Sequence, residues 1–254
     1  MAKSDRRETE ILERGDIFFL FRPRVEEEGP EGLDDVQRFF VALRPEGGGK
    51  VRLLTVGRKR LPDVAEHERQ WGFVAMVAGS GQAIERELRA VDYETKTRGE
   101  RHEPAARPAG EGVYAISLED GQMHLSYVLE LPDKSSEVQK ALEIRREASF
   151  ALSVKNPERG QPSGAGLAPK EKPDYPDKLQ REFKGRRFEQ KDVRLLDFEN
   201  AEFMLVGARG DPQKAYDLDL DAEQETYQRA DIVRDLRMTK SRHPIEPLFE
   251  GRWR

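Results

Sequence analysis

Two pairs of arginines follow stretches of the chain that have the apolar pattern of β-strands. Arg22 and Arg24 come directly after one such stretch, and Arg58 and Arg60 come after another. Side chains two positions apart in an extended segment point to the same side, so each pair presents two guanidinium groups together. A guanidinium binds phosphate or carboxylate through paired hydrogen bonds. If the two strand ends are neighbours, the four arginines predict a site that binds an anion.

A polar segment further along the chain adds a second group of candidates. Lys96, Arg98 and Arg101 supply more cations for the same anion, and His102 has glutamates two positions before it and one position after it. A histidine beside a carboxylate can act as a general base near neutral pH, which makes His102 the candidate catalytic residue. The structural alternative is a solvated rim, because cations at strand ends also protect sheet edges from aggregation.

Three hypotheses for the function follow from these residues. The first is a non-enzymatic, soluble protein that binds a small ligand bearing phosphate or carboxylate through the clustered arginines. The second is a hydrolase or transferase that uses His102 as its general base. The third is a homo-oligomeric assembly protein, in which arginine-rich and acidic segments pair between subunits and the polar C-terminal tail, residues 211–254, is exchanged.

Motifs that would identify a cofactor or a metal are absent from the sequence. The 254 residues include no cysteine, and the four histidines lack the spacing of a metal-binding pair. The acidic run that begins at Asp217 lacks the glycine and the glutamate of a calcium-binding loop. We therefore expect neither a metal nor a cofactor.

The charge balance and the hydropathy restrict the partners. Forty-nine acidic residues outnumber 44 lysines and arginines, for a formal net charge of −5, which disfavours a nucleic acid as the partner. No apolar stretch is long enough to cross a membrane, and the first residues lack the apolar core of a secretion signal. These observations predict a cytoplasmic protein.

Short apolar runs that end at glycine or proline predict a chain of antiparallel strands with a few short helices, an α+β fold. The pattern predicts strands at residues 15–21, 38–45, 51–57, 71–77, 112–118, 124–131, 149–155, 186–189 and 202–207, and helices at 82–90, 136–144 and 177–184. The same order of three strands occurs twice, which suggests an internal duplication. We expect a β-rich half at 1–91, a connecting loop at 92–111, a second β-rich half at 112–210 and the tail at 211–254.

Several segments, polar loops included, resemble an uncharacterised protein family found in bacteria and plants. They are GDIFFLFRPRV, DVQRFFVALRP, VGRKRLPD, RQWGFV, YETKTRGERH, ARPAGEGVYAI, LSVKNPE and DFENAEFMLVGA, in this order. The resemblance covers about residues 13–250. It implies a soluble, self-contained protein, and it implies no activity, cofactor or catalytic residue.

Overall fold

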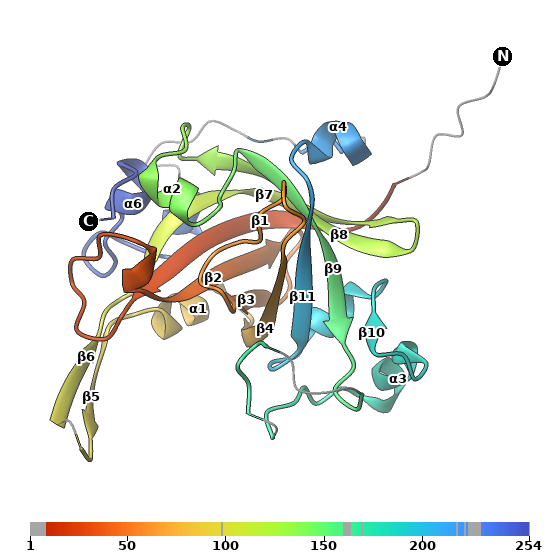
Figure 1. Cartoon of the computed structure of the whole chain (residues 1–254), viewed down its shortest axis with the longest axis horizontal. Helices are drawn as coiled ribbons and strands as arrows, with labels where there is room; N and C mark the ends of the chain where they lie inside the picture. Colours follow the sequence, from red (N-terminus) through yellow and green to blue (C-terminus); the bar gives the residue numbers. More distant parts are fainter. Residues whose placement is uncertain are drawn as a thin grey trace.

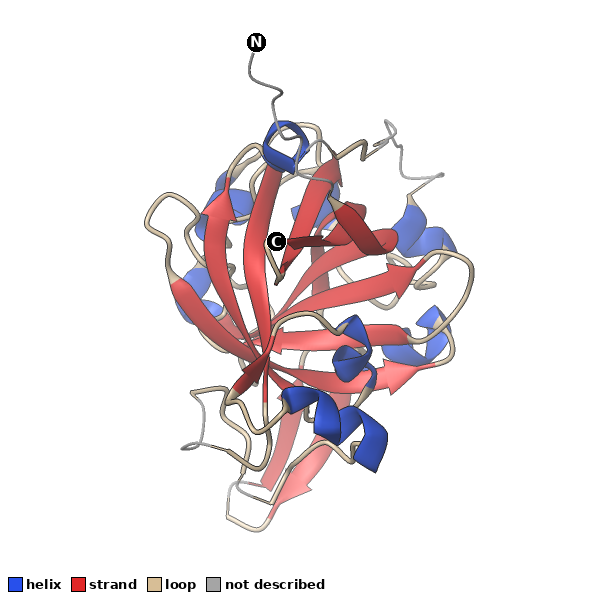
Figure 2. Cartoon of the chain, turned by 90° about the vertical axis from the view of Figure 1, so that its right-hand side faces the viewer, coloured by secondary structure: helices blue, strands red, loops and turns tan. Residues whose placement is uncertain are grey.

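Eight antiparallel strands close a β-barrel (Figures 1 and 2). The computed structural model describes residues 9–97, 99–159, 164–168, 170–216, 218–220, 222 and 230–253. The barrel strands are β1 (Glu10–Pro23), β2 (Val36–Pro45), β3 (Val51–Val56), β4 (Arg69–Ala78), β7 (Arg107–Glu119), β8 (Gln122–Leu131), β9 (Glu147–Lys155) and β11 (Glu202–Arg209). Their order around the barrel is β1, β2, β3, β4, β11, β9, β8 and β7, and β7 pairs with β1.

The fold is therefore a β-barrel, and the α+β prediction was wrong. Closure depends on pairings between strands that are distant in the sequence: Phe18 lies opposite Glu111 where β1 meets β7, and Gly72 lies opposite Phe203 where β4 meets β11. A local apolar pattern predicts a strand but carries no information about which distant strand will be its neighbour. The predicted strands themselves are confirmed, and their ends differ from the observed ends by at most five residues.

Two four-strand units build the barrel. Strands β1 to β4 form one antiparallel meander, and β7, β8, β9 and β11 form the other. The units meet at the β1–β7 pair and at the β4–β11 pair, so strands from both halves of the chain close a single barrel. This arrangement has the same strand order in each half, and the origin of the halves by duplication stays a prediction.

Short helices and one small strand surround the barrel (Figure 2). They are α1 (Gly81–Glu87), α2 (Glu137–Ala141), α3 (Asp177–Gln180), α4 (Pro212–Tyr216), α5 (Asp231–Arg234) and α6 (Glu246–Phe249), with 3-10 helices η1 (Leu33–Asp35), η2 (Arg181–Phe183) and η3 (Val193–Asp197), and strand β10 (Phe188–Glu189) beside β9. Among the described residues, no helix combines the length and the apolar composition that a membrane crossing requires.

Packed side chains fill the interior of the barrel. Phe19 and Phe21 of β1 belong to the interior cluster, and the ring of Phe19 meets that of Tyr127 edge to face at 4.9 Å. The alternate residues Phe18 and Leu20 lie on the outer face, where α1 and the C-terminal segment cover them. Burial on both faces explains why this strand is a continuous apolar run in the sequence.

The C-terminal segment packs on the barrel of its own chain. Trp253 is 4% exposed, and its ring meets Phe21 edge to face at 5.2 Å. Ile232 and Leu248 are fully buried against the outer face of the sheet. These contacts place residues 230–253 of the predicted extended tail in a folded layer, and exchange of the tail between subunits stays a prediction.

A two-stranded hairpin projects from the barrel (Figure 1). It consists of β5 (Val91–Thr95) and β6 (Gly99–Glu103), within the segment expected to be a connecting loop. The sequence pattern did not predict these strands because most of their side chains are polar and none is buried, so no apolar run marks them. The candidate residues Lys96, Arg101 and His102 all lie on this hairpin.

Candidate functional site

Arg22 lies inside the protein, where it links separate parts of the backbone. The side chain is 5% exposed and donates hydrogen bonds to the carbonyl oxygens of Glu87 (2.8 Å), Pro104 (3.0 Å) and Arg89 (3.1 Å). Burial lowers the pKa of this guanidinium, and nearby glutamates work in the opposite direction. The donors of Arg22 are therefore used to fix the end of α1 against the segment that precedes β7. Arg24, two residues later, is exposed.

Arg58 and Arg60 share one carboxylate. Arg58 Nη1 lies 3.1 Å from Glu68 Oε1, and Arg60 Nη1 lies 2.9 Å from Glu68 Oε2. Burial works to raise the pKa of Glu68, but the backbone N–H of Asp63 and the guanidinium of Arg60 lower it overall. Strand β2 lies between β1 and β3. Arg58 and Arg60 contact the carboxylate of Glu68, whereas Arg22 contacts backbone carbonyl oxygens, so they and Arg22 bind different partners.

The hairpin candidates form a set of surface ion pairs. His102 Nδ1 lies 2.5 Å from Asp92 Oδ1, and its Nε2 lies 2.8 Å from Glu28 Oε1. Arg101 Nε lies 3.2 Å from Glu26 Oε1. Lys96 is exposed in the hairpin turn, and Arg98 lies outside the described residues.

These contacts determine the protonation state of His102. The hydrogen bond to Asp92 raises the pKa of the imidazole, and the charge of Glu28 adds to this effect. A carboxylate at each ring nitrogen lets both nitrogens donate, which favours the imidazolium form. A general base requires the neutral form, so this geometry suits a clamp that holds the hairpin to the loop after β1.

A different set of arginines lines a pocket on the outside of the barrel. Arg44 comes from the end of β2, Arg234 from α5, and Arg237 from the segment after α5. The pocket has a volume of about 370 Å³. Its other lining residues are small or uncharged apart from Asp235: Pro45, Gly48, Gly49, Val51, Gly79, Ser80, Gly81 and Gln82.

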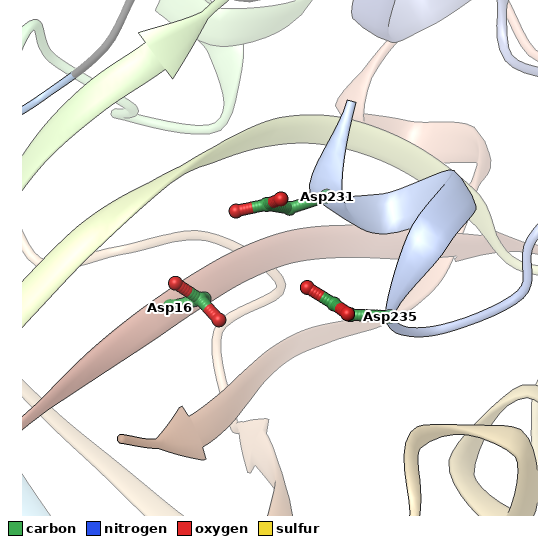
Figure 3. Close-up of side chains that lie close together, drawn as sticks. All are labelled: Asp16, Asp231 and Asp235. Carbon is green, nitrogen blue, oxygen red and sulfur yellow. The ribbon is translucent and has the colours of Figure 1, made fainter. Parts of the chain in front are cut away.

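Three carboxylates lie behind this arginine pocket. Figure 3 shows Asp16 of β1 and Asp231 and Asp235 of the α5 region directed toward a common space, with oxygen atoms within 4.8 Å of one another. Arg44 Nη1 lies 2.5 Å from Asp16 and 3.4 Å from Asp235. Arg234 bonds Asp231 and lies 3.3 Å from Asp235. The guanidinium groups of Arg44 and Arg234 pair with these carboxylates, so the cluster is an ion-pair network.

Burial and pairing act against each other at Asp16. Burial raises the pKa of its carboxyl, whereas the hydrogen bond and the positive charge of Arg44 lower it, and the net shift is upward. Ionised Asp16 thus depends on its arginine partner. Carboxylate and guanidinium hold each other in place, and the network positions Arg44 at the edge of the pocket.

Close backbone packing holds the pocket together. A Cβ atom on Gly81 would lie 2.1 Å from the carbonyl oxygen of Asp235, so only glycine lets α1 begin this close to the end of α5. Leu236 and Met238 are fully buried, and Arg237 between them is exposed. The backbone of Arg237 has a φ of +59°, in the left-handed region. These anchors direct the Arg237 side chain away from the core.

The residues of this pocket were not among the candidates predicted from the sequence. Arg44 ends a strand immediately before the PEGGGK turn, and the arginine–turn combination is a weak local signal. Arg234 and Arg237 lie in a segment without recognisable strand or helix periodicity. The resemblance to the bacterial and plant family also stays a prediction. Comparisons of the chain with protein-family models, with curated proteins and with solved structures found no match.

Proposed function

We propose that the protein binds a small ligand through a phosphate or carboxylate group, without catalysis, in the pocket lined by Arg44, Arg234 and Arg237. The observation that carries this proposal is that three arginines from two distant parts of the chain line one hollow. Guanidinium is the side-chain group best suited to planar, bidentate contact with these anions. The class of ligand is the one predicted from the sequence, and the arginines are different.

The ion-pair network prepares Arg44 for binding. Both of its carboxylate contacts, to Asp16 and Asp235, are made by the same nitrogen, Nη1. The edge formed by Nε and Nη2 is the one suited to a ligand, because it presents two parallel donors. A side chain that is already held in place loses less conformational entropy on binding, which increases affinity.

The wall opposite the arginines leaves room for the ligand. A Cβ atom added at Gly48, Gly49 or Gly79 would meet no atom within 4 Å. Gly48 and Gly49 have positive φ angles, so the three-glycine turn reaches a conformation that other residues rarely adopt. Glycine on this side lets an anion approach the guanidinium groups without a steric barrier.

The charges also predict how binding depends on salt. The three arginines are balanced by the three aspartates of the network, so the pocket attracts anions over short distances only. Affinity should therefore depend on hydrogen-bond geometry more than on net charge. Phosphate and sulfate should bind better than chloride at equal ionic strength.

Thermal unfolding with inorganic phosphate tests the proposal. At constant ionic strength, with chloride as the replacement, phosphate at ten times its Kd should stabilise the protein by about 1.4 kcal/mol. This corresponds to about 3 °C in Tm for a chain of this length. Arg237→Met should abolish the effect, because it removes one of the three guanidinium groups without disturbing a buried side chain.

Filling the pocket gives an independent arm with a matched control. Gly79→Val places a side chain in the open space and should also abolish the phosphate effect. Gly32 equally has no atom within 4 Å of an added Cβ and lacks a positive φ, so Gly32→Val controls for the substitution itself. Arg24→Met controls for the loss of an exposed arginine. The proposal fails if phosphate stabilises the two pocket variants as well as the unmodified protein, or if only Arg24→Met loses the effect.

A further inference from the structure

A second cleft lies on the outside of the barrel and is lined by residues of the β7–β8 hairpin, the end of β11 and α4. Its volume is about 910 Å³, within the range of small-molecule sites. Its chemically active lining residues are His67, Glu119, Asp120, His124, Arg209, Lys214 and Tyr216. The ring of His67 is hydrogen-bonded to the carbonyl oxygen of Gly207 at 2.9 Å. The arginine pocket shares none of these residues.

A hydrogen-bonded chain connects three residues that line this cleft through the buried Ser149. The backbone N–H of Arg209 donates to Ser149 Oγ (3.1 Å), and Ser149 Oγ contacts Tyr216 Oη at 3.5 Å. Tyr216 Oη lies 3.1 Å from His124 Nδ1. When the tyrosine oxygen accepts from the serine, its own hydrogen goes to Nδ1, which leaves Nε2 as the protonated nitrogen of a neutral ring. Burial lowers the pKa of His124 and so favours this neutral form.

Residues of opposite charge line the cleft around the neutral His124–Tyr216 pair. Glu119 and Asp120 come from the β7–β8 turn, and Arg209 and Lys214 come from β11 and α4. Glu119 and Arg209 both lie close enough to act on the imidazole of His124, the first raising its pKa and the second lowering it. The cleft thus offers an anionic wall and a cationic wall to the same small molecule.

Glu119 has an unsatisfied acceptor. Its Oε1 atom is buried and has no hydrogen-bond partner among the described residues. A buried carboxylate oxygen without a donor is costly, and an ammonium group of a ligand would satisfy it. This observation, which is independent of the cationic wall, points to a ligand that carries a positive charge at this end.

The β7–β8 turn and the chain around α4, which carry the charged residues of the cleft, are each fixed by local contacts. Asp120 and Gly121 have φ angles of +48° and +81°, which form a tight turn at the end of the β7–β8 hairpin. On the other side, Thr9 Oγ1 donates to the carbonyl oxygen of Tyr216 (2.8 Å). Leu218 and Leu220 bury themselves against the outer face of β7 and β8 and anchor the chain after α4.

We propose that this cleft binds a zwitterionic small molecule of the free amino acid class, with its carboxylate on Arg209 and Lys214 and its ammonium group on Glu119 and Asp120. The neutral His124–Tyr216 pair lies between the two charged ends and donates to the ligand from Nε2. This site is separate from the arginine pocket and does not depend on the anion-binding function proposed for it.

Binding of amino acids to the full chain tests the inference by calorimetry. Each of the common free amino acids is compared with its N-acetyl derivative, which lacks the ammonium group, and with its amide, which lacks the carboxylate. At least one free amino acid should bind, and both of its derivatives should bind at least tenfold more weakly. The inference is overturned if no free amino acid binds, or if a derivative binds as tightly as its parent.

Variants then assign the two charged ends. Arg209→Gln should weaken the free amino acid at least tenfold and leave its amide unchanged, and Glu119→Gln should weaken it similarly and leave the N-acetyl derivative unchanged. Arg24→Met, which removes an exposed arginine outside both pockets, should leave the binding of all three ligands unchanged. If a variant unfolds, the His124 ring resonances of the unmodified protein provide a second readout, because they should shift on addition of the free amino acid. Unshifted resonances would refute the site.

Discussion

Replacing Arg52 with methionine tests the ion-pair network inside one end of the barrel. Arg52 is 3% exposed and donates to Glu13 through Nη1 (2.6 Å) and Nη2 (2.8 Å), and to Asp197 through Nε (2.8 Å). Tyr114 Oη donates to Glu13 at 2.7 Å. Burial alone would lower the pKa of Arg52, but the two carboxylates raise it above its ordinary value. Methionine fills the space of the aliphatic part of the arginine side chain and removes the charge.

The expected cost follows from the burial of the partners. Removal of one member of a buried ion pair typically costs about 3 to 5 kcal/mol, because the other charge is left without compensation. The side chains of Glu13 and Asp197 are 12% and 24% exposed, so both regain some hydration in the variant. We therefore expect the low end, about 3 kcal/mol. At about 2 °C per kcal/mol for a chain of this length, Tm should fall by about 6 °C.

Thermal and urea unfolding at pH 7 measure this loss, with Arg58→Met as the control. Arg58 is also an ion-paired arginine, but its side chain is 72% exposed, and exposed pairs contribute about 1 kcal/mol or less. The control should therefore lower Tm by about 2 °C at most. The reasoning is refuted if Arg52→Met is no less stable than Arg58→Met, because burial would then not determine the cost.

Three further predictions concern the hairpin, the strand packing and the C-terminal segment. The pKa of His102, measured by NMR titration, should lie above 6.5 and should fall in Asp92→Asn. The difference in the free energy of unfolding between the two proteins should be largest below about pH 6.5 and should disappear as the pH rises through the folded pKa. A difference that does not depend on pH would contradict this prediction. Gly112→Ala places a Cβ 2.0 Å from a carbonyl oxygen of β8, so urea unfolding should show a loss of about 3 kcal/mol, against less than about 0.5 kcal/mol for Gly32→Ala. Trp253→Ala should cost about 3 kcal/mol at every protein concentration, because the ring packs on its own barrel, and a concentration-dependent loss would indicate packing between subunits instead.

The strands were predictable because their sequence pattern has a local physical cause. Strand β1 is buried on both faces and ends at a proline, so its position follows from an apolar run and a stop signal. The hairpin of β5 and β6 has no such pattern, since it projects from the barrel and buries few side chains. The fold class was misjudged for a related reason: closure of the barrel depends on the β1–β7 and β4–β11 pairs, which no local pattern specifies.

The class of ligand was predicted from the sequence, whereas the position of its proposed site was not. The sequence by itself determined that arginines are plentiful near strand ends, that no cysteine is available, and where nine strands lie. Only the tertiary structure decided which arginines are structural and which line a hollow: Arg22 is enclosed by backbone carbonyls, whereas Arg44 lies beside Arg234 and Arg237. The physical reason is that a guanidinium's role depends on the acceptors that reach it in space, and strand pairing and packing bring those acceptors from distant parts of the chain.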